Sequence, residues 1–287
     1  MRGQGHFPGP IASLLLLMAA MMITSIGILL QIDPRETGAV AGIGPVAIAL
    51  TIGFGGVASA AVRFVPPPHP ERLGLRVFEA HHLPWLLALV PFVIVASELD
   101  NVLASLLPAA ADASASFAEE SALAIAQEAI ARVGLMPVVT EWFFRGVILQ
   151  GAVAHLGRGG GLFFTAVLSA LLMPPMASSA PLVAVGISLL FGLLLGAVRL
   201  ATGSLLASIL LHASWQAIIV AAASLAGRFP IDGLNVPGTH TAPLLLGASL
   251  GSVAWGLWML WHTEPPTPLV LPIPEPTARG DDEGGFF

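Results

Sequence analysis

The chain has 287 residues, of which 56% are hydrophobic and only 10% are charged, and its net charge at pH 7 is −6. Soluble domains carry about 25% charged residues, so this composition excludes a soluble enzyme, a nucleic-acid-binding protein and a disordered chain. The chain contains no cysteine, which excludes disulfides and thiolate metal sites. We therefore expect an all-α polytopic membrane protein, because membrane-spanning helices satisfy their own backbone polar groups in lipid.

Eight apolar stretches are long enough to cross a membrane, which takes about 20 residues for each helix. In chain order they cover residues 11–31, 38–62, 83–107, 134–155, 161–178, 182–200, 203–226 and 242–262. The first stretch is too long for a signal peptide, and we expect it to be retained. The pattern predicts one bundle of about eight transmembrane helices.

The distribution of arginines predicts that the N- and C-termini both lie in the cytoplasm, because cytoplasmic loops carry the excess of positive charge. In this orientation seven arginines fall inside and three outside. The inner ones are Arg2, Arg63, Arg72, Arg76, Arg158, Arg199 and Arg279, and the outer ones are Arg35, Arg132 and Arg228. We expect an integral protein of a bacterial plasma membrane, with membrane lipid as its surroundings.

Three segments lie outside the predicted spans. Residues 64–82 are rich in proline and charge and predict a stiff cytoplasmic connector. Residues 109–133 place apolar side chains on one helical stripe, which predicts an amphipathic helix lying on the outer face of the membrane. The acidic, proline-rich residues 263–287 predict a disordered cytoplasmic tail.

Two spans carry ionisable side chains, which are costly in lipid and therefore indicate function. Glu141 and Arg145 are four residues apart in the fourth span, so they share a helix face and can pair. An ion pair that only locks helix packing is the alternative. His212 and Gln216 have the same spacing in the seventh span, at a depth that matches Glu141. The sequence thus predicts one buried polar site built from both spans.

Two other polar groups lie near the ends of spans. Glu98, Asp100 and Asn101 stand near the outer end of the third span, where they either solvate the helix end or line an outer vestibule. Residues 199–204 predict a tight cytoplasmic turn, with Ser204 available as the N-cap of the next helix.

Residues 139–146, Val-Thr-Glu-Trp-Phe-Phe-Arg-Gly, resemble the first motif of the CPBP family of intramembrane proteases, which includes the CAAX proteases. That motif usually has two adjacent glutamates, three residues and Arg-Gly. The last motif of the family resembles Thr202-Gly-Ser-Leu205 followed by His212 and Gln216, and Arg72-Leu-Gly-Leu-Arg76 resembles a loop typical of the family. The close resemblance covers about residues 134–225.

The resemblance implies an eight-helix bundle with a water-holding cavity in the membrane and cleavage of a peptide bond by glutamate-activated water. It implies catalytic roles for Glu141, Arg145, His212 and Gln216, and substrate contacts for Thr140 and Phe144. It also divides the chain into an N-terminal part, a protease-like core, a last membrane helix and a tail, which are residues 1–132, 133–226, 227–262 and 263–287. A prenylated or transmembrane peptide is the implied substrate.

The sequence departs from the family pattern at the first motif, where Thr140 replaces the usual base, and at the middle motif. The middle motif normally ends in histidine, but residues 172–177 contain none. Two hypotheses follow: an endopeptidase with Glu141 as base, or a non-catalytic relative that binds a lipidated or transmembrane client. We expect no cofactor and no metal, because one buried histidine cannot build the three-ligand zinc site of a metalloprotease.

Overall fold

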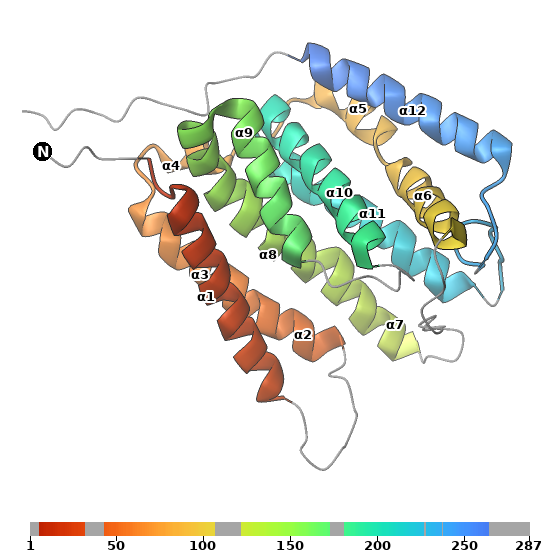
Figure 1. The fold of residues 1–287 in the computed structure, drawn as a ribbon, viewed down its shortest axis with the longest axis horizontal. Helices are drawn as coiled ribbons and strands as arrows, with labels where there is room; N and C mark the ends of the chain where they lie inside the picture. The colour runs from red at the N-terminus through yellow and green to blue at the C-terminus, as the bar shows by residue number, and fades with distance from the viewer. Residues whose placement is uncertain are drawn as a thin grey trace, which may run out of the picture.

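The computed structural model describes residues 6–31, 43–106, 122–172, 181–226, 228–236 and 238–263. Within these ranges the chain forms helices that lie side by side in one bundle (Figure 1). In chain order they are α1 (Pro10–Leu29), α2 (Ile43–Leu50), α3 (Gly56–Ala61), α4 (His69–Leu73), α5 (Leu83–Ala88), α6 (Phe92–Leu106), α7 (Ala122–Ala129), α8 (Met136–Glu141), α9 (Leu149–Leu172), α10 (Pro181–Thr202), α11 (Leu205–Leu225) and α12 (Pro243–His262).

Seven helical stretches of the described chain are long and apolar enough to span a membrane. One of them, Leu123–Leu171, has 49 residues, which is about 74 Å of helix and more than twice the thickness of a bilayer core. Gly157 breaks this stretch, since its φ of 73° and ψ of 173° are not helical. Figure 1 shows that the ribbon labelled α9 folds back on itself. Counted as two spans, the stretch brings the described residues to eight, which agrees with the prediction of about eight transmembrane helices.

Residues 122–133, the described part of the segment 109–133 that was predicted to lie on the outer surface, differ from that prediction. From Ala122 the chain runs through α7 and a π-helical turn at Ile130–Leu135 directly into α8, so these residues extend the fourth span. Arg132 forms an ion pair with Glu128 one turn earlier, which reduces the cost of both charges in an apolar helix. The boundary drawn between residues 132 and 133 therefore falls inside a continuous helix. Residues 107–121 lie outside the described chain.

Two clusters of buried apolar side chains form the core. The first surrounds Phe54, Phe143 and Leu17 and joins α1 and α3 to the α8–α9 helix. The second surrounds Trp85 and Trp215 and joins α5 to α10, α11 and α12. Glu141 lies two residues before Phe143, and His212 lies three residues before Trp215. The candidate site residues therefore come from helices that contribute to both clusters.

Candidate active site

The side chains of Glu141, Arg145 and His212 meet in the interior of the bundle. Arg145 donates a hydrogen bond from Nη1 to Glu141 Oε1 over 3.0 Å, and His212 Nδ1 lies 3.0 Å from the same oxygen. The exposed fractions of the three residues are 0%, 3% and 5% in the order Glu141, Arg145, His212. The sequence prediction that Glu141 pairs with Arg145 close to His212 is therefore confirmed.

Arg145 ties this cluster to a third helix. It lies in a π-helical turn, Trp142–Ile148, that connects α8 to α9. Its Nη2 donates to the backbone carbonyl of Gly192 in α10 over 2.9 Å. A Cβ atom at Gly192 would lie 2.7 Å from Ser169 Oγ, so the absence of a side chain lets α9 and α10 approach closely at this level. The site thus joins α8, α10 and α11.

Two buried polar atoms of this cluster, Glu141 Oε2 and Arg145 Nε, have no hydrogen-bond partner among the described residues. The same is true of Gln216 Oε1, one helical turn after His212 on α11. A buried polar atom left unsatisfied costs about 1–3 kcal/mol, and more when it belongs to a charged group. Such atoms keep their capacity to bind a small polar molecule. One oxygen of the Glu141 carboxylate, Oε1, is therefore hydrogen-bonded, and the other, Oε2, can still accept a hydrogen bond.

Ser208 is a further polar residue at the site that the sequence analysis did not identify. It is fully buried one helical turn before His212 on α11, and its hydroxyl donates to the Leu205 carbonyl over 2.9 Å. The sequence contains a pattern that could have identified Ser208, because Ser208, His212 and Gln216 are spaced four residues apart and so share one face of α11.

The two residues expected to contact substrate lie elsewhere. The Thr140 hydroxyl donates to the Met136 carbonyl of its own helix over 2.8 Å. Phe144 is 1% exposed and packs in the first core cluster, with its ring 6.2 Å from that of Phe54. The structure therefore does not bring either side chain to the Glu141 carboxylate. Residues 173–177 of the middle motif lie outside the described chain.

No group of three or more histidine, cysteine, aspartate or glutamate side chains in the described ranges could hold a metal ion. Glu141 and His212 supply two potential ligands, and the third neighbour is the Arg145 guanidinium, which repels a cation. The chemistry of this donor set fits acid–base catalysis or anion binding better than metal binding.

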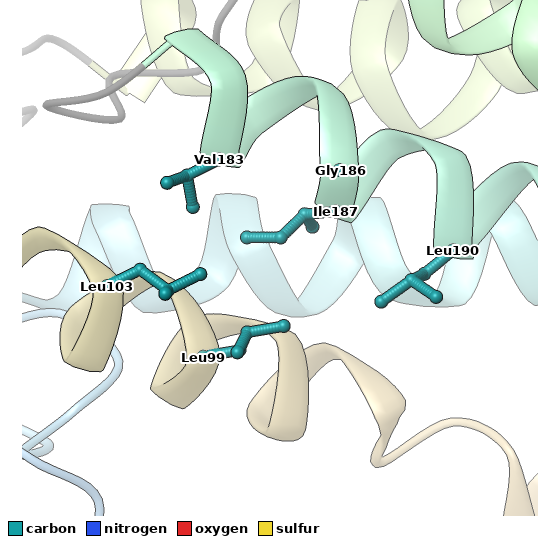
Figure 2. A pocket seen from close by; sticks show the side chains of 6 residues that line it. All are labelled: Leu99, Leu103, Val183, Gly186, Ile187 and Leu190. Atoms are coloured by element: carbon teal, nitrogen blue, oxygen red, sulfur yellow. The ribbon is translucent and has the colours of Figure 1, made fainter.

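An apolar crevice of about 410 Å³ lies between α6 and α10 (Figure 2). It is lined by Leu99, Leu103, Val183, Gly186, Ile187 and Leu190. Leu190 stands two residues before Gly192, so the crevice runs along α10 toward the level of the Arg145 contact. Its lining suits a hydrocarbon chain and offers no side chain for acid–base chemistry.

Comparison with known proteins identifies the part of the chain that carries this site. Residues 123–218 match the family model described as type II CAAX prenyl endopeptidase Rce1-like. The matched segment holds Glu141, Arg145, Ser208, His212 and Gln216. No match was found among curated proteins or among solved structures. Residues 123–218 are therefore similar to CAAX-protease-like membrane proteins, and the chain is an integral membrane protein.

Proposed function

We propose that this protein is an intramembrane endopeptidase in which Glu141 activates the attacking water. One observation carries the proposal: Glu141 binds both Arg145 and His212 through Oε1, while Oε2 has no partner among the described residues. A general base needs an acceptor within hydrogen-bond reach of the water that it deprotonates. Oε2 supplies that acceptor, in a carboxylate whose orientation is held by two donors.

The proposed reaction is a hydrolysis. Glu141 Oε2 takes a proton from water as the water oxygen bonds to the peptide carbonyl carbon, and the carbonyl oxygen becomes an oxyanion. Arg145 Nε and the Gln216 amide are the donors assigned to the oxyanion. When the tetrahedral intermediate collapses, the C–N bond breaks and Glu141 returns its proton to the leaving amine. His212, whose Nδ1 faces Glu141, is assigned to orienting the carboxylate.

A second candidate function is non-catalytic binding of a lipidated or transmembrane client. Two observations favour it. The residue at the usual base position, Thr140, uses its hydroxyl on the Met136 carbonyl. The apolar crevice beside α10 offers a surface for a hydrocarbon chain. In this alternative the ion pair of Glu141 with Arg145 only stabilises the bundle.

The decisive experiment is cleavage of a prenylated CAAX reporter peptide by the purified protein in nanodiscs, compared with Glu141→Gln. The endopeptidase proposal expects slow cleavage that Glu141→Gln abolishes and that a chelator leaves unchanged. Binding of the reporter without cleavage, equal in the two proteins, would establish the binding function instead. Glutamate at the usual base position should raise turnover, so Thr140→Glu combined with Ala177→His is expected to exceed the wild type.

A further inference from the structure

A contact outside the site joins two segments that are far apart in the sequence. The loop of residues 72–76 lies against the turn between α10 and α11. Three alternate carbonyls of the loop each accept a hydrogen bond from the turn. These bonds are Arg199 Nη2 to Arg72 O at 3.1 Å, Leu205 N to Gly74 O at 2.8 Å, and Ser204 Oγ to Arg76 O at 2.6 Å. We call this set of contacts the loop clamp.

Arg199 and Gly74 fit each other at the centre of the loop clamp. Gly74 has a φ of 72°, and a Cβ atom there would lie 2.3 Å from Arg199 Cζ. The guanidinium therefore fills the space that a side chain would need. Arg199 is 0% exposed, and its Nε and Nη1 have no hydrogen-bond partner among the described residues. A buried cation is costly unless it is compensated, so the fold retains Arg199 against that cost.

The loop clamp acts on the start of the helix that carries His212. Ser204 is the N-cap of α11 and Leu205 is its first residue, so the loop holds the first turn of this helix. His212 follows seven residues after Leu205, about two helical turns or about 11 Å along the axis. Over that length an α-helix is rigid, and a shift of one residue in register would rotate His212 by about 100°.

We propose that Arg199 is a positioning residue that, through the loop clamp, sets the rotation and height of α11 so that His212 Nδ1 meets Glu141. The proposal is based on three hydrogen bonds and on the close contact between Gly74 and the Arg199 guanidinium, all at the N-terminal end of α11. The proposal rests on the proposed function only for its effect on turnover. The contact between His212 and Glu141 is a matter of geometry and can be measured in a protein that cleaves nothing.

The test measures the ¹⁵N signals of the His212 imidazole in histidine-labelled protein in nanodiscs, assigned by their loss in His212→Gln. Arg199→Gln and Gly74→Ala should both move the Nδ1 signal away from its hydrogen-bonded position. Ser204→Ala removes one bond of the loop clamp and should move it less in the same direction. Arg199→Lys keeps the charge without the planar group and should restore the signal only partly.

The matched control is Gly233→Ala. Gly233 also has a positive φ, 78°, and a Cβ atom there would lie 2.3 Å from the Thr241 backbone nitrogen, in the loop between α11 and α12. Both alanine variants should lower the thermal unfolding temperature, but only Gly74→Ala should move the His212 signal. An unchanged His212 signal in folded Gly74→Ala and Ser204→Ala, or an equal change in Gly233→Ala, would overturn the proposal.

Turnover separates this inference from the proposed function. If the wild type cleaves the CAAX reporter, Arg199→Gln should lower kcat by about ten- to a hundred-fold with little change in KM, because a small misplacement affects the reacting groups and not remote binding. If the wild type does not cleave it but the His212 signal responds to Arg199→Gln, the endopeptidase proposal fails and the positioning proposal stands. If the wild type cleaves the reporter but the His212 signal does not respond to the loop-clamp variants, the positioning proposal fails and the endopeptidase proposal stands.

Discussion

Two glutamate–histidine pairs in this molecule have nearly the same geometry and different surroundings. Glu141 Oε1 lies 3.0 Å from His212 Nδ1, and Glu98 Oε1 lies 2.8 Å from His240 Nδ1. Both glutamates are buried, but the His240 side chain is 55% exposed and the His212 side chain 7%. The second oxygen of Glu98 accepts a hydrogen bond from the Thr241 nitrogen over 2.7 Å. The second oxygen of Glu141 has no partner in the described chain.

The difference separates a structural contact from a candidate reactive one. Beside Glu98, the side chains of Ser97 and Asn101 both donate to the Gly233 carbonyl, over 2.7 and 2.8 Å. These residues fasten the loop between α11 and α12 to α6. Glu98 and Asn101 thus bind this loop, a contact that neither sequence interpretation of the polar group, solvation of a helix end or lining of a vestibule, had included. A carboxylate whose oxygens are both used holds structure, and one with a spare acceptor can take part in chemistry.

The largest expected effect is on the stability provided by the Glu141 cluster. Arg145→Ala leaves the Glu141 carboxylate buried without its cation and should destabilise the protein by about 3–5 kcal/mol. The loss is measured by unfolding in detergent. Arg145→Ala combined with Glu141→Gln should recover part of it, since the uncompensated charge is then gone. A double variant no more stable than Arg145→Ala would mean that the two side chains are not coupled.

Loss of the Glu98 contact should destabilise the protein less than loss of Arg145 does, and it should leave the candidate active site intact. Glu98→Gln keeps one acceptor but turns an amide donor toward either His240 or the Thr241 nitrogen, so one hydrogen bond is lost, about 1–3 kcal/mol. We expect a lower unfolding temperature with unchanged turnover or binding of the CAAX reporter. Glu141→Gln is the matched comparison and should abolish cleavage. Loss of cleavage in folded Glu98→Gln would remove the distinction between the two pairs.

The Arg145–Gly192 contact makes the Glu141 pair depend on close packing of α10. Gly192→Ala should destabilise by about 1–3 kcal/mol, because its Cβ would meet Ser169 and the backbone of Ala166. The control is Gly247→Ala in α12, where a Cβ meets no atom of the described chain within 4 Å. That substitution should be neutral to within about 0.5 kcal/mol. Equal effects of the two substitutions would show that α10 does not support the site through this glycine.

A third histidine extends the comparison, because it faces a cation and not a carboxylate. His6 Nδ1 lies 3.2 Å from Arg72 Nη1, and the Gln150 side chain donates to the Phe7 carbonyl over 2.5 Å. Burial, and then the charges of Arg72 and His155, lower the pKa of His6 below its ordinary value of about 6.5. The undocked segment therefore binds the extra proton more readily. The docking of residues 6–9 should be complete above that value and weaken as the pH falls below it.

The pH dependence of this docking is the smallest of the expected effects. It can be measured with a spin label at Ile11→Cys, since residue 11 is exposed and the chain has no other cysteine. We expect the label to become more mobile between pH 7.5 and pH 5. His6→Asn keeps a polar side chain without a titrating ring and should remove the pH dependence. A mobility change of the same size in His6→Asn would assign it to another group.

Local patterns in the amino-acid sequence were enough to predict which helices form and which side chains share a face. Hydropathy and spacing were sufficient for the spans and for the pairing of Glu141 with Arg145, and the depth of His212 placed it at the same level. These inferences hold because the periodicity of a helix is local and each span must be apolar along its length. The same local reasoning failed for residues 122–133, where an ion pair lets the fourth span continue beyond its predicted start.

The rotation of the helices against one another follows from their packing in the bundle and could not be predicted from local patterns. That rotation directs Phe144 into the core, brings the Gly192 carbonyl to Arg145 and leaves Glu141 Oε2 with its acceptor unused. It also brings Arg199 to the carbonyl of Arg72, 127 residues away along the chain. No local pattern encodes these contacts, because the packing of side chains between helices sets their relative rotation, and that packing depends on all of the neighbouring helices at once.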